Sequence, residues 1–406
     1  RQGDGPSAAV GLLPMISNLR EKLSMLENRR ADPQAAASAA PRARIECRRF
    51  IETLPPGALM SGGAPADPAV MTAEEISALF RVPAGDDYSP GRMLFLDTET
   101  TGLSGGAGTV AFLIGLGWFL QDGGFMLEQY FMQDYDREAD MLERLCERLE
   151  RASMLVTFNG KCFDAPIISS RSIINRIRPP LDRLTHLDLL HPSRRMYRRR
   201  LGSCSLGCLE REVLGVVRDG DIPGSEIPDI FFRYLRDGDF TRLEQVLAHN
   251  RQDILSMALL MDALCRAWRD PGSLNEPWDL YSCGRICEER SDPRAVQCYA
   301  RADLPEARRA LAAWHRRRGE WDEAIALWHD IVRRGESGIY AYVELSKYYE
   351  HRARDPETAL AISEKALNRL RTLGFHDTMR EEARALSARI ARLRRRAGRL
   401  NAERAG

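Results

Sequence analysis

The sequence predicts a mixed α/β domain followed by an all-α domain built from repeated pairs of helices. Three apolar, strand-like segments follow one another between residues 93 and 132, and helical and strand-like segments then alternate up to residue 190. Beyond residue 273 the pattern is helical and recurs roughly every 34 residues. We therefore expect an N-terminal helix with a flexible linker (1–45), an extension without an assigned role (46–91), the α/β domain (92–270) and the helical repeats (274–400).

The composition is that of a globular protein with no global preference for nucleic acid. Apolar residues make up 44% of the chain, charged residues 29%, and the formal net charge is +1. No stretch approaches the roughly 20 apolar residues of a membrane span, and the opening residues lack the pattern of a secretion signal. Nine cysteines without a disulfide-like framework indicate a reducing compartment. We expect a cytoplasmic protein without a membrane partner.

Two pairs of cysteines have the spacing of neighbours on one helix. Cys204 and Cys208 are four residues apart, and so are Cys283 and Cys287. Two such pairs could form a zinc site, but they lie far apart in the chain and lack the tight spacing of zinc knuckles. We interpret them as small core residues on helices.

The α/β domain begins with a strand that ends in two acids. The apolar run 93–96 leads into Asp97 and Glu99, and a Thr-Thr-Gly turn follows. Because strand side chains alternate, the two carboxylates emerge on the same face and repel each other. A divalent cation would relieve this repulsion, since hard cations such as Mg²⁺ prefer carboxylate oxygens. The alternative is an ordinary strand that ends in a solvated polar turn.

The elements that follow complete a sheet with helices on its faces. Strands are predicted at 109–119 and 125–132, joined by a turn at 121–124 that is typical of a hairpin. Helices and strands then alternate: a helix at 136–152, a strand at 154–158, a helix with apolar residues from 167 to 177 and a short strand at 186–190. Three meandering strands followed by this alternation describe a ribonuclease H-like mixed sheet flanked by helices.

Polar residues also follow the strand at 154–158. Asn159 and Lys161 lie at its exit, and Asp164 falls where the next helix begins. Taken singly, these residues fit a tight turn, a solvated lysine and a helix N-cap. The functional interpretation is that Asp164 adds a third carboxylate at the edge of the sheet where the first strand ends, with Lys161 as a phosphate contact.

A third motif lies on a predicted helix over residues 243–264. His249 and Asp253 are four residues apart and therefore point the same way, at the margin of an apolar stripe. An aspartate in that position costs free energy unless it is paired or binds metal. A lone histidine there would be an ordinary boundary residue, but beside the acids it is a candidate to take the proton of an attacking water.

Together these motifs resemble those of the DEDD (DnaQ-like) 3′–5′ exonuclease superfamily. D-x-E, N-x-K-x-F-D and H-x-x-x-D occur in the order of that superfamily. The run DTETTGLSGGAGTVAFLIGLGWF, with HNRQDILSM later, is most similar to its YprB-type ribonuclease H-like branch, and the resemblance covers residues 92–268.

The resemblance implies a site with two Mg²⁺ or Mn²⁺ ions and His249 as the general base. The metal-binding acids would be Asp97, Glu99, Asp164 and Asp253. The chain departs from the superfamily in one respect. His249 and Asp253 are four residues apart, a spacing that is typical of members with a tyrosine in place of the histidine, whereas members with histidine commonly have H-x-x-x-x-D. The resemblance also implies that the segment after the first acids lines the terminal nucleotide, through Thr100, Thr101, Gly102 and Leu103.

The approach to this site is predicted to be basic. Residues 171–200 hold nine arginines and two aspartates, a local net charge of +7, and RRMYRRR begins at Arg194 and Arg195. The alternative is a solvated charged face, but beside a phosphodiester site we predict that these two arginines and Asn159 contact the substrate. A loop at 218–228 is predicted to form one wall of the cleft.

The helical segments after residue 273 resemble tetratricopeptide repeats. Ala295, Ala324 and Ala359 fall at matching places in three helix–turn–helix segments, where small residues allow helices to cross. An irregular helical bundle is the alternative. Such repeats imply a protein partner or a contribution to substrate binding.

The sequence therefore predicts a metal-dependent nuclease acting on DNA or RNA, most simply a 3′–5′ exonuclease. Two alternatives stay open: a catalytically silent nucleic-acid or protein adaptor, and a structure-selective endonuclease on the same fold. The sequence does not decide between DNA and RNA.

Overall fold

The computed structural model describes residues 46–61, 64–66, 71–83, 90–102, 108–372, 374 and 379–405. The helix and linker predicted within residues 1–45, and Leu103 in the acidic motif, lie outside the described residues. Among the described residues, no helix is both long and apolar enough to cross a membrane.

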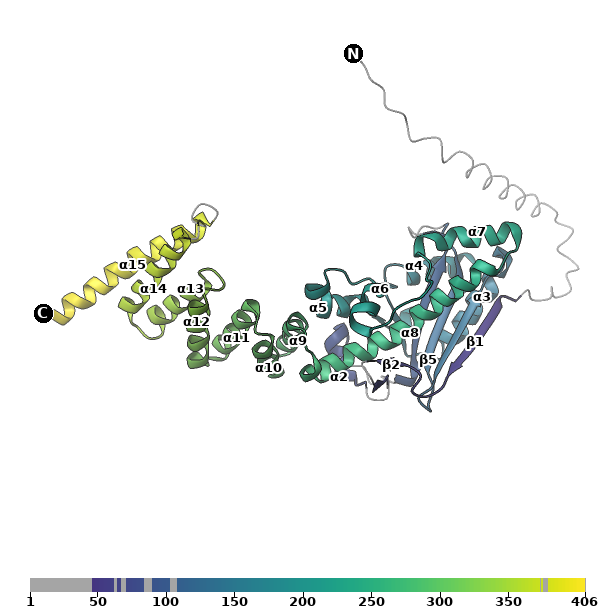
Figure 1. The fold of residues 1–406 in the computed structure, drawn as a ribbon, viewed down its shortest axis with the longest axis horizontal. Helices are drawn as coiled ribbons and strands as arrows, with labels where there is room; N and C mark the ends of the chain where they lie inside the picture. The colour runs from purple at the N-terminus through teal and green to yellow at the C-terminus, as the bar shows by residue number, and fades with distance from the viewer. Residues whose placement is uncertain are drawn as a thin grey trace, which may run out of the picture. The chain divides into compact units, whose positions relative to one another are not determined.

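A six-stranded mixed sheet forms the centre of the α/β domain, which confirms the predicted fold class (Figure 1). In spatial order its strands are β1 (Arg48–Leu54), β6 (Phe125–Phe131), β5 (Ala111–Phe119), β4 (Met93–Thr100), β7 (Met154–Thr157) and β8 (Thr185–Asp188). The first four pair antiparallel, whereas β4, β7 and β8 pair in parallel. The carboxyl ends of β4, β7 and β8 therefore meet at one edge of the sheet.

Residues 46–91, to which the sequence assigned no role, contribute to this domain. β1 pairs with β6 over all of its residues, so the sheet extends beyond the predicted start at residue 92. A small hairpin of β2 (Met60–Ser61) and β3 (Ala64–Pro65) and the helix α2 (Ala73–Phe80) follow. Glu75 of α2 is buried and pairs with Arg269, 2.6 Å away, at the end of α8.

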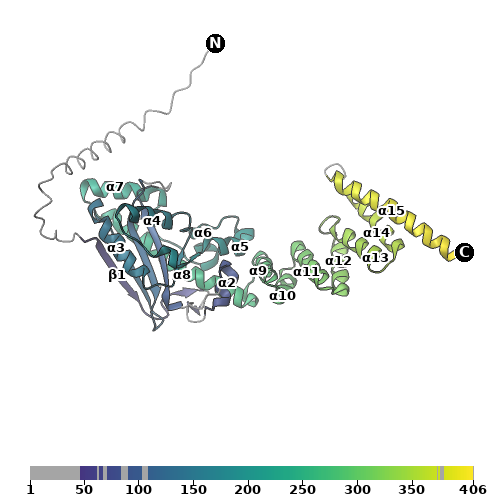
Figure 2. The same cartoon turned by 180° about the vertical axis from the view of Figure 1, so that it is seen from behind.

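Helices cover both faces of the sheet (Figures 1 and 2). The long helix α8 (Thr241–Arg269) packs against β4 and β5 on one face, in a core that includes Phe95. On the other face α3 (Glu138–Leu149) and α4 (Asp164–Ile174) share a core with Leu94 and Leu96. The alternation of apolar residues along β4 thus divides them between two separate cores.

Two glycines of β5 allow α8 to approach the sheet closely. Gly115 and Gly117 lie opposite Asp97 and Phe95 of β4. A Cβ atom at Gly115 would lie 2.1 Å from Asn250 Oδ1, and one at Gly117 would lie 2.5 Å from Ile254 Cγ2. The Gly-Leu-Gly run in this strand is therefore a requirement of helix packing, since any larger side chain would push α8 outward.

The region after residue 273 consists of successive packed helices. They are α9 (Pro277–Glu289), α10 (Arg294–Ala302), α11 (Pro305–Arg318), α12 (Trp321–Arg334), α13 (Tyr340–His351), α14 (Pro356–Thr372) and α15 (Arg380–Ala405). Ala295, Ala324 and Ala359 lie on α10, α12 and α14 and are fully buried, as their equivalent positions predict. The helix pairs agree with the predicted architecture, while the tetratricopeptide identity stays a prediction.

The predicted core cysteines are mostly buried. Cys283 and Cys287 of α9 and Cys298 of α10 form one buried group, with sulfur atoms within 4.8 Å of one another. Cys204 is also buried, whereas Cys208 is half-buried. The association of Cys283 and Cys287 with Cys298 joins two helices, which the spacing within one helix could not reveal.

Candidate active site

The two acids of β4 face the long helix α8. Phe95, Asp97 and Glu99 share one face of the strand, and Phe95 belongs to the core formed with α8. The pairing of β4 with β5 is irregular between Glu99 and Thr100, where the strand ends. Both carboxylates therefore lie at the carboxyl edge of the sheet, directed toward the helix that bears His249 and Asp253.

Asp97 is held by a chain of amide groups. Asn250 Nδ2 of α8 donates to Asp97 Oδ2 at 2.8 Å, and Gln129 Nε2 of β6 donates to Asn250 Oδ1 at 2.8 Å. Burial raises the pKa of Asp97 well above its usual value, and the charges of Asp253 and Glu99 raise it further. This hydrogen-bond network keeps the carboxylate in place against that repulsion.

Glu99, His249 and Asp253 come together from β4 and α8. Their ligand atoms all lie within 4.8 Å of one another. His249 Nε2 is 3.6 Å from Asp253 Oδ2 and 4.0 Å from Glu99 Oε1. Burial raises the pKa of Glu99 well above its usual value, with Asp253 and Asp164 adding to the effect. Three of the predicted site residues therefore form one compact group.

Asp164 joins the site from the other side of the sheet edge. It is the first residue of α4, and its Oδ1 accepts a hydrogen bond from Thr98 Oγ1 at 2.5 Å. Burial raises its pKa to about 6 despite the bond from Thr98. Its charge also raises the pKa values of Asp97 and Glu99, so the four acids form one electrostatic cluster.

The donor set of this cluster fits hard divalent cations. Four carboxylates, one of them buried and three partly buried, supply oxygen atoms only, and burial is the main cause that raises the pKa of each. A divalent cation supplies the opposite charge and prefers oxygen ligands. Asp97, Glu99, Asp164 and Asp253 are the residues that would hold it.

Three charged residues in and before the loop at 215–223 also belong to the site, although the sequence did not indicate them. Arg218 donates hydrogen bonds to Asp253 and, through Nε at 2.7 Å, to the buried Glu210. Asp221 Oδ1 lies 2.6 Å from His249 Nδ1. Together with His249 and Asp253 they line a cleft of about 450 Å³. The predicted loop wall is thus present, and its charged residues contact the catalytic candidates directly.

Comparisons with known proteins agree with this architecture. Residues 94–265 match the model of the RNase H superfamily. The chain is 30% identical over 337 residues to the "Uncharacterized protein YprB" of Bacillus subtilis (strain 168), covering 80% of both chains. This chain belongs to the YprB family.

Solved structures also align with part of this family member. The family B DNA polymerase of the hyperthermophilic archaeon Pyrobaculum calidifontis aligns with a TM-score of 0.36 and 13% identity, over 50% of this chain and 29% of that chain. The RNase H superfamily domain and the carboxylate cluster together support a nuclease-type function for this member of the YprB family.

The predicted nucleotide-lining segment of this family member follows the acids directly. Thr100 Oγ1 donates to the carbonyl of Gly102 at 2.8 Å, and Thr101 N donates to the carbonyl of Val110 at 2.9 Å. The backbone up to Gly102 is therefore fixed next to Glu99. Leu103 lies outside the described residues.

Asn159 and Lys161 lie at the same edge through a turn built around Asp188. The backbone amides of Asn159 and Lys161 donate to the buried Asp188 carboxylate at 2.8 and 3.2 Å. Asn159 has a φ of 64°, which asparagine tolerates. The Lys161 side chain is exposed, and Asp188 has the structural role of fixing the turn.

Arg194 and Arg195 lie on α5 (Leu190–Leu201), which follows β8. Arg195 Nη1 donates to the carbonyls of Ala78 and Leu79 of α2, and Nη2 pairs with Glu289 at 2.8 Å. None of these contacts joins Arg195 to the acids. Its structural role in holding α2 could not be foreseen from the charge pattern.

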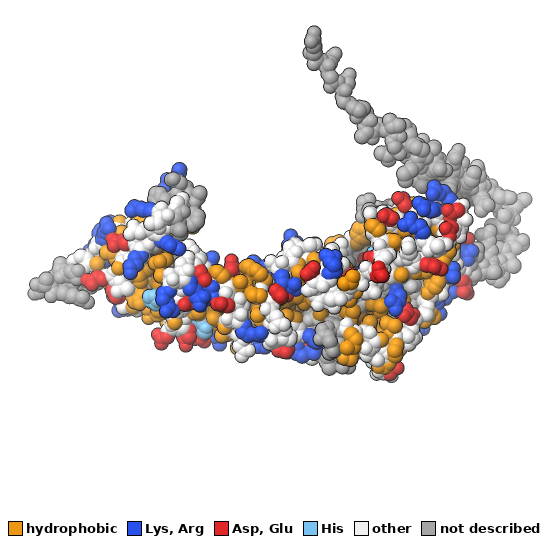
Figure 3. All heavy atoms as spheres, viewed as in Figure 1, with side chains coloured by type: hydrophobic (Ala, Val, Ile, Leu, Met, Phe, Trp, Pro, Cys, Tyr) orange, Lys and Arg blue, Asp and Glu red, His pale blue; other side chains and the backbone are white. Residues whose placement is uncertain are grey.

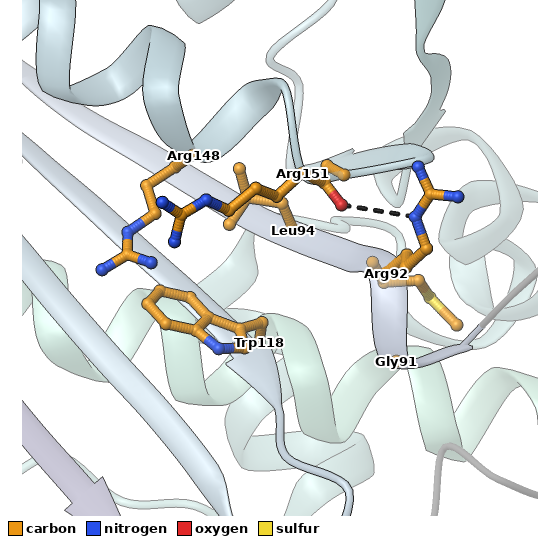
Figure 4. Close-up of a pocket in the computed structure, with 8 residues that line it drawn as sticks. Gly91, Arg92, Leu94, Trp118, Arg148 and Arg151 are labelled. Atoms are coloured by element: carbon orange, nitrogen blue, oxygen red, sulfur yellow. Dashed lines mark hydrogen bonds between the residues drawn. The ribbon is translucent and has the colours of Figure 1, made fainter.

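Another cavity lies at the opposite end of β4 (Figure 4). It has a volume of about 220 Å³ and is lined by residues around Met93 and Leu94, with Trp118 and Arg148. Arg148 stacks over the Trp118 ring at 4.7 Å and pairs with Glu128. The cavity lies at the start of β4, whereas Asp97 and Glu99 lie near the end of this strand. The cavity is therefore separate from the acid cluster.

Proposed function

We propose that this chain is a metal-dependent nuclease that hydrolyses phosphodiester bonds of nucleic acid as a 3′–5′ exonuclease. The observation that supports this most strongly is the convergence of Glu99, His249 and Asp253 within 4.8 Å, next to Asp97. A strand and a helix more than 140 residues apart in sequence supply these groups. No structural purpose is served by crowding buried acids, whereas phosphoryl chemistry needs the cations that they attract.

The acids would hold two divalent ions, Mg²⁺ or Mn²⁺. When bound, two such ions supply charge stabilisation for both the attacking and the leaving oxygen of an in-line displacement. Asp97 would be one ligand, since the charges of Asp253, Glu99 and Asp164 all act on it. Glu99, Asp164 and Asp253 would supply the other carboxylate oxygens.

His249 has the geometry of a general base. An ionised carboxylate only accepts hydrogen bonds, so in the neutral imidazole the 2.6 Å contact with Asp221, shorter than the 3.4 Å contact with Arg218 Nη1, favours the proton on Nδ1 and leaves Nε2 as an acceptor facing the acids. Burial opposes ionisation of Asp221, but the hydrogen bond with His249, the charges of His249 and Arg218 and the amide of Ile222 together hold the pKa of Asp221 below its usual value. Asp221 thereby positions the imidazole to take a proton from water.

Substrate contacts are proposed for the residues around this edge. Thr100, Thr101 and Gly102 would line the terminal nucleotide beside Glu99, and Lys161 would reach a phosphate from the turn around Asp188. The helical region after residue 273 would bind a protein partner or more of the substrate.

Hydrolysis of end-labelled and circular oligonucleotides with Mg²⁺ or Mn²⁺ tests this function. A 3′–5′ exonuclease releases a 3′ label first as a mononucleotide and leaves circular substrates intact. Cleavage of circles would instead identify a structure-selective endonuclease. Absence of cleavage for DNA and RNA, with binding retained, would identify an adaptor.

A further inference from the structure

A strongly basic pocket lies where α5 packs against α9. It has a volume of about 590 Å³, and its lining comes from both helices and from the end of α2. Six arginines face one carboxylate there: Arg81, Arg194, Arg195, Arg198, Arg199 and Arg285, with Glu289. The space-filling view shows basic and acidic side chains interspersed over much of the visible face (Figure 3).

The one carboxylate in the pocket lining, that of Glu289, already forms ion pairs with two of the arginines. Glu289 lies 2.9 Å from Arg81 and 2.8 Å from Arg195. Arg285 is 3.8 Å from Glu288. Burial lowers the pKa of Arg195, Glu289 opposes this effect, and the charge of Arg81 adds to it. The pocket therefore keeps a surplus of positive charge after its internal ion pairs are formed.

The side chains of two arginines in this pocket have no hydrogen-bond or ion-pair partner among the described residues. Arg194 and Arg198 lie one turn apart on α5 and are exposed, and their guanidinium groups make no hydrogen bond or ion pair with any residue that the structure describes. Guanidinium groups crowded in this way repel one another unless an anion lies between them. Their planar donor pairs match phosphate oxygens in a bidentate manner.

The course of α5 connects this pocket to the acid cluster. The amide of Leu190, at the start of α5, donates to Asp188, the same carboxylate that fixes the turn of Asn159 and Lys161 at the active-site edge. With 1.5 Å per residue, Arg194 and Arg198 lie roughly 6 and 12 Å along the helix from that edge. A strand of several nucleotides can span this path.

We infer that the pocket between α5 and α9 binds backbone phosphates of the nucleic-acid strand whose end occupies the carboxylate site. The identity of the ligand as nucleic acid rests on the proposed function, whereas phosphate recognition rests on the arginines alone. Because Arg285 belongs to α9, the helical region contributes to substrate binding through its first helix.

Charge reversal at Arg194 and Arg198 provides the test. We compare Arg194→Glu/Arg198→Glu with the matched control Arg178→Glu/Arg183→Glu. The side chains of the control arginines are also exposed and unpaired among the described residues, but they lie before β8, at the opposite edge of the parallel strands. Binding of fluorescent single strands of 4 and 20 nucleotides is measured in EDTA, where metal-dependent hydrolysis cannot interfere.

We expect the pocket variant to bind the long strand at least tenfold more weakly than the wild type. We expect it to bind the short strand with the affinity of the wild type. The slope of log affinity against log salt concentration for the long strand should fall by about 0.7 for each phosphate that the variant no longer neutralises. Equal weakening by the control, or wild-type binding by the pocket variant, would overturn the inference. Displacement of the long strand by micromolar pyrophosphate would also overturn it, in favour of a free-anion site.

These outcomes separate the inference from the proposed function. If length-dependent binding is abolished in the pocket variant but no substrate is hydrolysed by the wild type with any metal, the pocket stands and the nuclease proposal fails. If hydrolysis occurs and the pocket variant binds and cleaves long strands normally, the pocket inference fails and the nuclease proposal stands.

Discussion

At the scale of single residues, the site is a balance between buried negative charge and the groups that hold it. Asp97 accepts from Asn250, Asp164 accepts from Thr98, and Asp253 accepts from Arg218. These three acids are thus held by donors of the protein, and a carboxylate has lone pairs left to bind a cation. Burial, and after it the charges of neighbouring acids, still raise the pKa values of Asp97 and Glu99 well above their usual range.

The first prediction concerns Asp97→Asn. The amide keeps an oxygen that can accept from Asn250 but loses the charge needed to hold metal, so hydrolysis should fall roughly a thousandfold, since metals supply several kcal/mol of transition-state stabilisation. The melting temperature of the metal-free variant should be unchanged or higher, because one repulsive charge is gone. Wild-type turnover by this variant would refute the metal site.

The second prediction concerns the pH dependence of the metal-free protein. Because the pKa of Asp164 is about 6 in the folded state and its ordinary value is 3.8, the folded state binds more protons between these values. The free energy of unfolding in EDTA should therefore increase as the pH falls from about 7 to 5, by at most about 1.4 kcal/mol per pH unit per proton. Urea unfolding at several pH values measures this. The Asp164→Asn variant should show a weaker dependence, and an unchanged slope would contradict the assignment.

The third prediction concerns Asp221→Asn. An asparagine at this position no longer favours the tautomer with the proton on Nδ1 of His249, so turnover should fall about ten- to a hundredfold. Binding of an oligonucleotide in EDTA should stay at the wild-type level, which a folding defect would not allow. A decrease of binding in parallel with turnover would argue against a positioning role.

At the scale of elements, the site depends on how closely α8 approaches β5. The side chain of Asn250 occupies the space above Gly115, and this close approach is what brings Asp97 and Asp253 together. We predict that Gly115→Ala destabilises the fold by about 1–3 kcal/mol, as overpacking of a core does, and that it removes activity. Thermal melts compared with Gly91→Ala, where a Cβ atom meets nothing within 4 Å, provide the check. Equal melting temperatures would contradict the packing argument.

The elements with strong local patterns were predictable from the sequence, and the contacts between distant segments were not. The acids of β4, the start of α4 at Asp164 and the His249–Asp253 face of α8 follow from strand and helix periodicity. Arg218 and Asp221 lie on a loop without periodicity, and their partners on α8 are 28 or more residues away. β1 was not assigned because it is an edge strand, half exposed, with a weak apolar alternation.

At the scale of the whole molecule, as far as the structure describes it, the α/β domain and the first helices after it share one core. The buried cluster around Phe95 continues through α8 to Cys283 of α9 and to Leu311 and Trp314 of α11. Arg200 of α5 also pairs with the buried Asp279 of α9 at 2.9 Å. By contrast, residues 324–345 contribute to a separate cluster of α11 to α13. The change of sequence pattern near residue 273 is therefore not a boundary of packing.

This continuity predicts different outcomes for two truncations. A chain that ends after residue 273 loses α9 to α11 and exposes the apolar side of α8 and α5, so it should melt well below the full chain or aggregate. A chain that ends after residue 338 keeps that core intact and should retain the melting temperature of the α/β domain, because the helices removed belong to other clusters. Differential scanning calorimetry of both, with proteolysis to follow the α/β domain, measures the difference. If the shorter chain were as stable as the longer one, α9 to α11 would be an independent domain, and the arginine pocket between α5 and α9 would lose its rigid frame.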